Sequence, residues 1–145
     1  MKRLLVLVVL VSFGSIFMPI QAYGTACTNS TLFGAFGYQE QGRYAAQGVD
    51  FRVVGNIKFD GKGKANGTFT IWYSDFTVTG GPIVLSYSVE PDCRVSWRDV
   101  TYGDGETYTG VIVSNGQKIL YIETTGDPAR SGEAEKIRVT SQNSQ

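Results

Sequence analysis

The sequence predicts an all-β protein, a small antiparallel up-and-down barrel of about eight strands. Apolar and polar residues alternate along most of the chain, which is typical of strands with one buried face. No segment sustains the apolar spacing of an amphipathic helix. Glycine- and proline-rich turn signals recur at short intervals, as they do in all-β barrels and sandwiches.

The N-terminal segment is typical of a secretory signal peptide. Lys2 and Arg3 precede an apolar run from Leu4 to Phe17, and Pro19 interrupts the chain before a group of small residues. The run falls short of the roughly 20 apolar residues that a membrane span needs, so a retained anchor is the less favoured alternative. The pattern predicts a secreted or periplasmic protein with no stable membrane insertion after cleavage.

Cleavage after Ala22 divides the chain into a signal peptide, residues 1–22, and a single β-barrel domain, residues 23–145. Gly24 and Ala26 offer alternative cleavage sites, because each is also small. Cleavage removes two of the 13 basic residues against 13 acidic ones, so the mature chain is mildly acidic. Such a surface has no electrostatic reason to bind nucleic acid.

Seven segments after the N-terminal region carry the strand pattern. In chain order they are "VDFRVVGNIKF" at 49–59, "TFTIWY" at 68–73, "IVLSYSVE" at 83–90, "CRVSWRDV" at 93–100, "TYTGVIVS" at 107–114, "KILYIETT" at 118–125 and a last short "EKIRVT" at 135–140. A strand before them, near the mature N-terminus, would complete eight.

The connections favour a barrel over a sandwich. "DGKG" at 60–63 and "SNGQ" at 114–117 supply Asp-Gly and Asn-Gly pairs suited to tight hairpins. We expect longer loops at 79–82 ("TGGP") and 125–132 ("TGDPARSG"), and a corner at 90–93 ("EPDC") where proline ends a strand. Short hairpins without a long crossover favour the up-and-down barrel, which also removes exposed strand edges.

The two cysteines are predicted to form one disulfide. Cys27 and Cys93 both remain after cleavage, and paired thiols outside the cytoplasm are normally oxidised. A redox-active pair would need the close Cys-x-x-Cys spacing, which is absent. Lipidation of Cys27 is a weaker alternative, because Gly24 stands where an aliphatic residue is expected.

Four motifs together resemble a group of uncharacterised secreted bacterial proteins. They are "ACTNSTLFGAFGY", "GNIKFDGKGKANGTFT", "YSVEPDCRVSW" and "GQKILYIETTGDPARSGEAEK", in matching order and spacing. That group resembles calycin-like barrels of the allene oxide cyclase type, which implies an eight-stranded antiparallel barrel and assigns no activity. Glu90 and Arg94 depart from the usual residues around its "PDC" corner.

The absence of histidine excludes several kinds of chemistry. The chain has no histidine, so histidine-dependent triads and the usual zinc sites are ruled out, and a disulfide leaves no thiolate nucleophile. We therefore expect no metal and no cofactor. The carboxylate pairs Glu90/Asp92, Asp104/Glu106 and Glu133/Glu135 lie at turns or strand ends, where solvation is the ordinary outcome.

Two acids and four aromatic residues are the candidates for a site. Asp99 and Glu123 continue apolar strand faces, so either would be a catalytic candidate if it pointed inward, although their places at strand ends favour exposure at the rim. The aromatic candidates for ligand binding are Tyr73, Tyr87, Trp97 and Tyr121. An eight-stranded barrel is only just wide enough for side chains, so filling of the core by these rings is favoured over a ligand cavity.

The sequence favours a secreted, non-catalytic, disulfide-linked barrel of unknown role, for which carrying a small hydrophobic molecule is one interpretation. The alternatives are a cyclase or isomerase of the allene oxide cyclase type and an envelope interaction module that uses only its outer face. The barrel interior separates them: a filled core favours the module, an open pocket without acids favours the carrier, and an open pocket containing Asp99 or Glu123 favours the enzyme.

Overall fold

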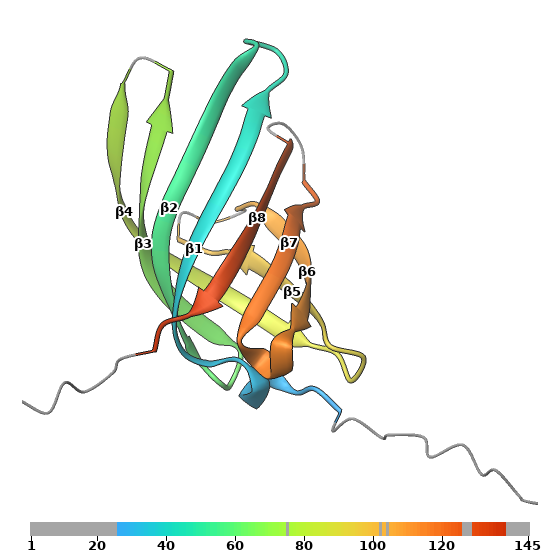
Figure 1. The fold of residues 1–145 in the computed structure, drawn as a ribbon. Coiled ribbons are helices and arrows are strands. Elements are labelled where there is room, and N and C mark those ends of the chain that lie inside the picture. The colour runs from blue at the N-terminus through green and yellow to red at the C-terminus, as the bar shows by residue number, and fades with distance from the viewer. Residues whose placement is uncertain (1–25, 75, 102, 104, 126–128, 139–145) are drawn as a thin grey trace, which may run out of the picture.

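Eight antiparallel strands form a closed barrel in a computed structural model that describes residues 26–74, 76–101, 103, 105–125 and 129–138 (Figure 1). Each strand pairs with the next in sequence, and β8 pairs back onto β1 to close the ring. The elements are η1 (Asn29–Thr31), β1 (Phe33–Tyr44), β2 (Val49–Asp60), β3 (Lys64–Tyr73), β4 (Thr77–Val89), β5 (Arg94–Asp99), β6 (Thr107–Val113), η2 (Ser114–Gly116), β7 (Lys118–Glu123) and β8 (Ala129–Lys136). The predicted eight-stranded up-and-down barrel is confirmed.

The expected loop at 79–82 is wrong, because these residues belong to β4. The β3–β4 register shifts between Thr68 and Thr70, which marks a bulge at this place. Gly80 faces the ring of Phe69 so closely that a Cβ would lie 2.1 Å from it. Gly80 therefore leaves room for the Phe69 ring within a continuous strand.

The expected loop at 125–132 and the last strand at 135–140 also need correction. Strand β8 begins at Ala129 and ends at Lys136, while residues 139 and 140 lie outside the described part of the chain. Its more buried positions include Arg130, Gly132 and Ala134. A face made of one charged and two small residues shows no apolar alternation, so the pattern does not indicate a strand.

A disulfide ties the N-terminal segment to the corner between β4 and β5. Cys27 and Cys93 are bonded, 66 positions apart, with a Cα–Cα distance of 5.0 Å. The Cys27 N–H also donates a hydrogen bond to the Pro91 carbonyl at 3.2 Å. A closed loop of this length constrains the unfolded chain by about 4 kcal/mol. The predicted disulfide is confirmed.

The short helix η1 lies across the lower end of the barrel in Figure 1. Leu32, directly after it, is fully buried. The Asn29 carboxamide oxygen accepts a hydrogen bond from the Val89 N–H at 2.8 Å, and the Tyr87 hydroxyl donates to the Leu32 carbonyl at 3.1 Å. These contacts close the lower end, above which Phe36, Phe59, Val95 and Ile119 are among the most deeply buried side chains of the core.

Candidate functional site

Arg130 carries the charged group at the centre of the upper barrel. It lies on β8, and its side chain lines the barrel interior with only 10 % exposure. Its Nε lies 2.7 Å from Glu123 Oε2, its Nη1 lies 3.7 Å from Glu40 Oε2, and its Nη2 contacts Glu106 Oε1. One guanidinium therefore holds three carboxylates from three other parts of the chain.

Two tyrosine hydroxyls extend this cluster. Tyr121 donates to Glu40 Oε1 at 3.0 Å, and Tyr108 donates to Glu106 Oε2 at 2.8 Å. Both rings pack on Trp97: Tyr108 is stacked at a centroid distance of 5.4 Å, and Tyr121 meets it edge-on at 4.8 Å. Packing against Trp97 therefore fixes the two tyrosine rings, and their hydroxyls in turn hold the carboxylates of Glu40 and Glu106 in place.

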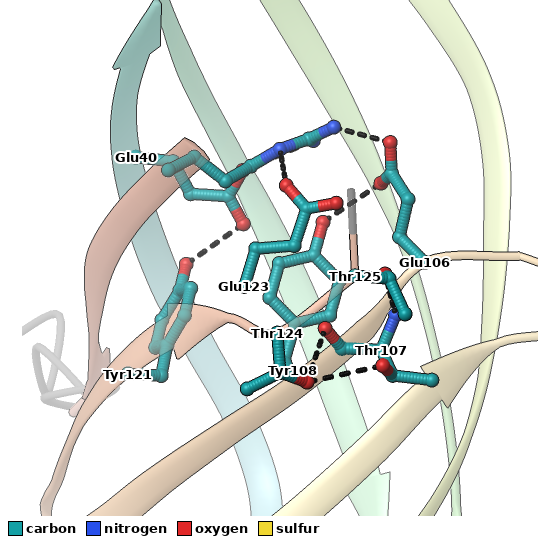
Figure 2. Close-up of polar contacts among 9 residues, drawn as sticks. Glu40, Glu106, Thr107, Tyr108, Tyr121, Glu123, Thr124 and Thr125 are labelled. Carbon is teal, nitrogen blue, oxygen red and sulfur yellow. Dashed lines mark hydrogen bonds and ion pairs between the residues drawn. The ribbon is translucent and has the colours of Figure 1, made fainter. Parts of the chain in front are cut away.

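Threonine contacts fix the strand ends that carry Glu106 and Glu123. The Thr107 N–H donates to Thr125 Oγ1 at 2.9 Å, and the hydroxyls of Thr107 and Thr124 lie 3.0 Å apart (Figure 2). These bonds join the start of β6 to the end of β7. The two acids that flank these threonines are consequently held at one height in the barrel.

The three carboxylates of the cluster, on Glu40, Glu106 and Glu123, share the single positive charge of Arg130. Burial raises the pKa of Glu40 and of Glu123, and the nearby charge of Glu106 raises both further, although Arg130 opposes the shift. Burial alone would lower the pKa of Arg130, but the surrounding tyrosine and carboxylates outweigh it and the net shift of that pKa is upward. Arg130 stays charged, while folding favours the protonated forms of Glu40 and Glu123.

An internal cavity of about 520 Å³ lies beside this cluster. The residues that line it are Tyr38, Glu40, Tyr44, Val53, Ile57, Phe69, Ile71, Tyr73, Val78, Ile83, Leu85, Trp97, Asp99, Gly105, Glu106, Tyr108 and Arg130. Apolar side chains thus form most of the wall, and the charged groups gather in one part of it.

The cavity reaches the upper rim of the barrel. Tyr44 and Tyr73, the last residues of β1 and β3, both line it, as does Gly105 in the β5–β6 connection. The two tyrosine rings stack at a centroid distance of 6.3 Å, and Phe76 stacks on Tyr73 at 4.7 Å. An aromatic group therefore flanks the upper part of the cavity.

The structure places most of the predicted site residues in the upper barrel. Tyr73, Trp97 and Asp99 line the cavity, and Tyr121 belongs to the charged cluster. Asp99 accepts a hydrogen bond from the Thr101 N–H at 2.8 Å. Tyr87 does not line the cavity, since its hydroxyl is bonded to main-chain carbonyls at the closed lower end.

The expectation that Glu123 is exposed at the rim is wrong. Its side chain retains 2 % exposure and contacts Arg130. A strand end lies at the surface only when no neighbouring strand extends beyond it. Here β8, which pairs with β7, extends above the end of that strand, as Figure 1 shows, and its Arg130 contacts the acid.

Sequence reasoning missed Glu40 and Arg130 and misjudged Glu106. Glu106 is predicted to be solvated, yet it binds Arg130 and Tyr108; Asp104 lies outside the described residues. The sequence offers a sign of the site at Glu40, which lies two positions after the buried Tyr38 and therefore on the same face of β1. By contrast, Glu133 and Glu135 form outer ion pairs with Lys118, as expected of surface acids.

Membrane-spanning helices and metal clusters are both absent from the described residues. No helix among them is long and apolar enough to cross a membrane. No group of three or more histidine, cysteine, aspartate or glutamate side chains in this part of the chain is arranged to hold a metal ion.

Comparisons with known proteins relate the chain to a designed barrel. No protein-family model matches the chain, and no curated protein matches it. Among solved structures, the chain is similar to a de novo designed fluorescence-activating β-barrel, with 18 % sequence identity and a TM-score of 0.44. That match covers 75 % of this chain and 96 % of the designed one.

Proposed function

We propose that this protein is a ligand-binding barrel that holds one small, largely hydrophobic molecule in its interior. The observation that carries this proposal is the cavity of about 520 Å³, which is open toward the upper rim and lined mostly by apolar and aromatic side chains. Small-molecule sites typically combine such walls with a few polar groups that orient the ligand. Here those groups are the carboxylates and the guanidinium.

An eight-stranded barrel is usually just wide enough for its own side chains to fill the interior. In this chain the side chains do not fill the interior completely, and they leave a cavity with Ile57, Ile83 and Leu85 on its apolar wall. Burying apolar ligand surface there would contribute about 25 cal/mol for each Å² removed from water. The cavity favours a ligand-binding function over an interaction module that uses only the outer face.

The location and domain organisation form part of the same proposal. A signal peptide at residues 1–22 would deliver a single barrel domain, residues 23–145, outside the cytoplasm. A disulfide between Cys27 and Cys93 is compatible with an oxidising compartment of this kind. The sequence resemblance to secreted bacterial calycin-like barrels supports the same location.

A cyclase or isomerase is the second candidate. Acidic side chains on the cavity wall favour it, because Asp99 and Glu40 both face the space that a substrate would occupy and the pKa of Glu40 is raised by burial. Each acid, however, already has a partner: Thr101 for Asp99, and Tyr121 with Arg130 for Glu40. If a substrate is identified, unchanged turnover in Glu40→Gln and Asp99→Asn variants would exclude these acids from the chemistry.

Native mass spectrometry of protein purified from its own host tests the ligand-binding proposal. We expect a species heavier than the denatured chain by the mass of one small organic molecule. An apo mass under gentle conditions, together with no uptake of added hydrophobic compounds, would contradict the proposal. The denatured mass also reports the cleavage site.

A pair of adjacent valines provides the matched variants. Val53 is buried and lines the cavity, whereas Val54 is exposed on the outer face of the same strand. Val53→Phe should fill part of the cavity and displace the ligand, while Val54→Phe should retain it. Equal retention by both folded variants would show that the ligand binds elsewhere.

A further inference from the structure

We propose that the ligand is an organic cation, an amine or quaternary ammonium group carried on an apolar body. This inference rests on the proposed function and specifies the ligand. The cationic group would lie near Glu40, Asp99 and Glu106 in the upper cavity, and the apolar body would lie deeper, toward Ile83 and Leu85.

The charge balance of the upper barrel favours a cation. Among the described residues, Glu40, Asp99 and Glu106 line the cavity, and one cationic side chain, Arg130, lines it with them. Glu123 adds a further carboxyl behind the guanidinium. Charges interact more strongly in a poorly solvated interior than in water, so this excess of acids disfavours an anionic ligand, whereas a cation beside Glu40 would favour the ionised form of that acid.

Arg130 does not offer a free site for a carboxylate ligand. Its guanidinium already contacts Glu40, Glu106 and Glu123. Those acids are part of the barrel wall and cannot leave, so an anionic head group would have to enter among them. A cation needs no displacement, because the carboxylates are already grouped around the cavity.

One ion pair of the cluster is incompletely satisfied. Arg130 Nε and Glu123 Oε2 are buried and lie in ion-pair contact, but neither has a partner with hydrogen-bond geometry. Arg130 therefore compensates the carboxylates around it incompletely, and a second positive charge in the cavity would add to that compensation.

Aromatic faces complete the environment expected for an organic cation. Tyr44, Tyr73, Trp97 and Tyr108 all line the cavity. Arg130 already uses one such face, since its Cζ lies 5.9 Å from the centroid of Tyr108. Cations are attracted to aromatic faces at about this distance, and aromatic side chains with carboxylates recognise substituted ammonium groups.

Four probes with the same apolar chain test the inference: octylamine, octyltrimethylammonium, octanoate and octanol. The chain has two tryptophans, so Trp72→Phe removes the outer one and leaves Trp97 as the reporter. Titration of Trp97 fluorescence at neutral pH should show both cations binding at least about tenfold more tightly than octanoate, with octanol between them.

The outcomes separate this inference from the proposed function. Tightest binding of octanoate, or equal binding of all four probes, would overturn the preference for cations and leave the hydrophobic site intact. Failure of every probe to bind would overturn both proposals.

Two variants locate the preference at the cavity. Glu106→Gln should weaken binding of octyltrimethylammonium by about tenfold while leaving octanol affinity nearly unchanged. Glu135→Gln removes an exposed acid from the outer face of β8 and should change neither affinity. If Glu106→Gln impairs folding, Asp99→Asn serves as the second cavity variant. Equal cation affinity in both cavity variants and in the Glu135 control would contradict the assignment.

Discussion

Arg130 stabilises an arrangement of acids that would otherwise repel one another. Glu40, Glu106 and Glu123 come from separate segments and meet around its guanidinium. Removing one partner from a buried ion pair leaves an uncompensated charge in a poorly solvated place. Arg130 therefore stabilises the fold by keeping these buried carboxylates paired with a positive charge.

Arg130→Met should therefore lower the free energy of unfolding by about 3 to 5 kcal/mol at neutral pH. The loss should shrink toward about pH 5, because without the guanidinium the pKa values of Glu40 and Glu123 rise further and both acids take up protons. Urea unfolding at several pH values measures this. Arg43→Met breaks an exposed pair with Asp50 and should cost less than about 1 kcal/mol. Equal losses in the two variants would contradict the prediction.

Glu40 makes stability fall as pH rises. Folding raises its pKa, so its contribution is fully present below the ordinary pKa of a glutamate and is lost as pH rises through the raised value. Glu40→Gln removes this group and should flatten the decline in melting temperature as pH rises above the ordinary pKa of a glutamate.

Glu133→Gln supplies a control of opposite sign. Lys118 and Gln39 lower the pKa of Glu133, so its contribution is present above the ordinary value and disappears as pH falls. Its variant should change only the acid side of the profile. A Glu40→Gln profile that parallels the parent protein would show that Glu40 does not titrate as inferred.

At the scale of single strands, close contacts between glycines and rings shape the barrel wall. A Cβ on Gly132 would lie 2.6 Å from the Tyr121 hydroxyl and 2.5 Å from a main-chain oxygen of Gln39. Gly42 and Gly55 stand equally close to the rings of Phe51 and Tyr38. These strands lack side chains at the places where large rings turn into the barrel.

Gly132→Ala should consequently destabilise the protein by about 1 to 3 kcal/mol, because the new methyl group must displace Tyr121 or the neighbouring strand. Gly37→Ala, on β1, places its Cβ 4.0 Å from the nearest atom and should change stability by less than about 1 kcal/mol. Chemical denaturation of both variants compares them. Similar effects would contradict the close-contact explanation.

The sequence pattern predicts individual strands where an apolar face alternates with a polar one. Strands β2, β5 and β7 satisfy this condition and lie near their expected positions. Strand β8 does not, because its inner face carries Arg130 and glycine. A strand that lines a polar part of the barrel interior lacks the apolar alternation by which strands are recognised.

Across the whole molecule, the two ends of the barrel differ in strand pairing and in side-chain packing. The lower end is closed by η1, the disulfide and fully buried apolar side chains. At the upper end, β4 pairs with β3 over Thr77–Pro82, whereas its pairing with β5 begins only at Leu85. The upper part of β4 is therefore an edge within an otherwise closed sheet.

Amide hydrogen exchange should follow this difference. The amides of Phe36, Val95 and Ile119, which belong to buried lower-barrel residues, should exchange at rates close to those set by global unfolding. Amides at 77–79 should exchange much faster, because that segment pairs on one side and buries no side chain. Exchange followed by NMR or mass spectrometry checks the order. Faster exchange in the lower barrel would contradict it.

The charged cluster could not be predicted from the sequence because barrel closure creates it. Glu40 and Arg130 meet only because β8 pairs with β1, at the two ends of the domain. Their separation along the chain carries no sign of that pairing. Trp97 and Asp99, by contrast, follow directly from alternation along one strand and could be predicted to share a face.

The described chain enters and leaves the barrel on the same side. Figure 1 shows η1 and the end of β8 at the lower end, remote from the cavity opening, and the Ile137 N–H is bonded to the Ala35 carbonyl there. The two ends of the described chain therefore both lie away from the cavity opening. A barrel held on a sensor surface through either of these ends should keep its interior accessible for screening.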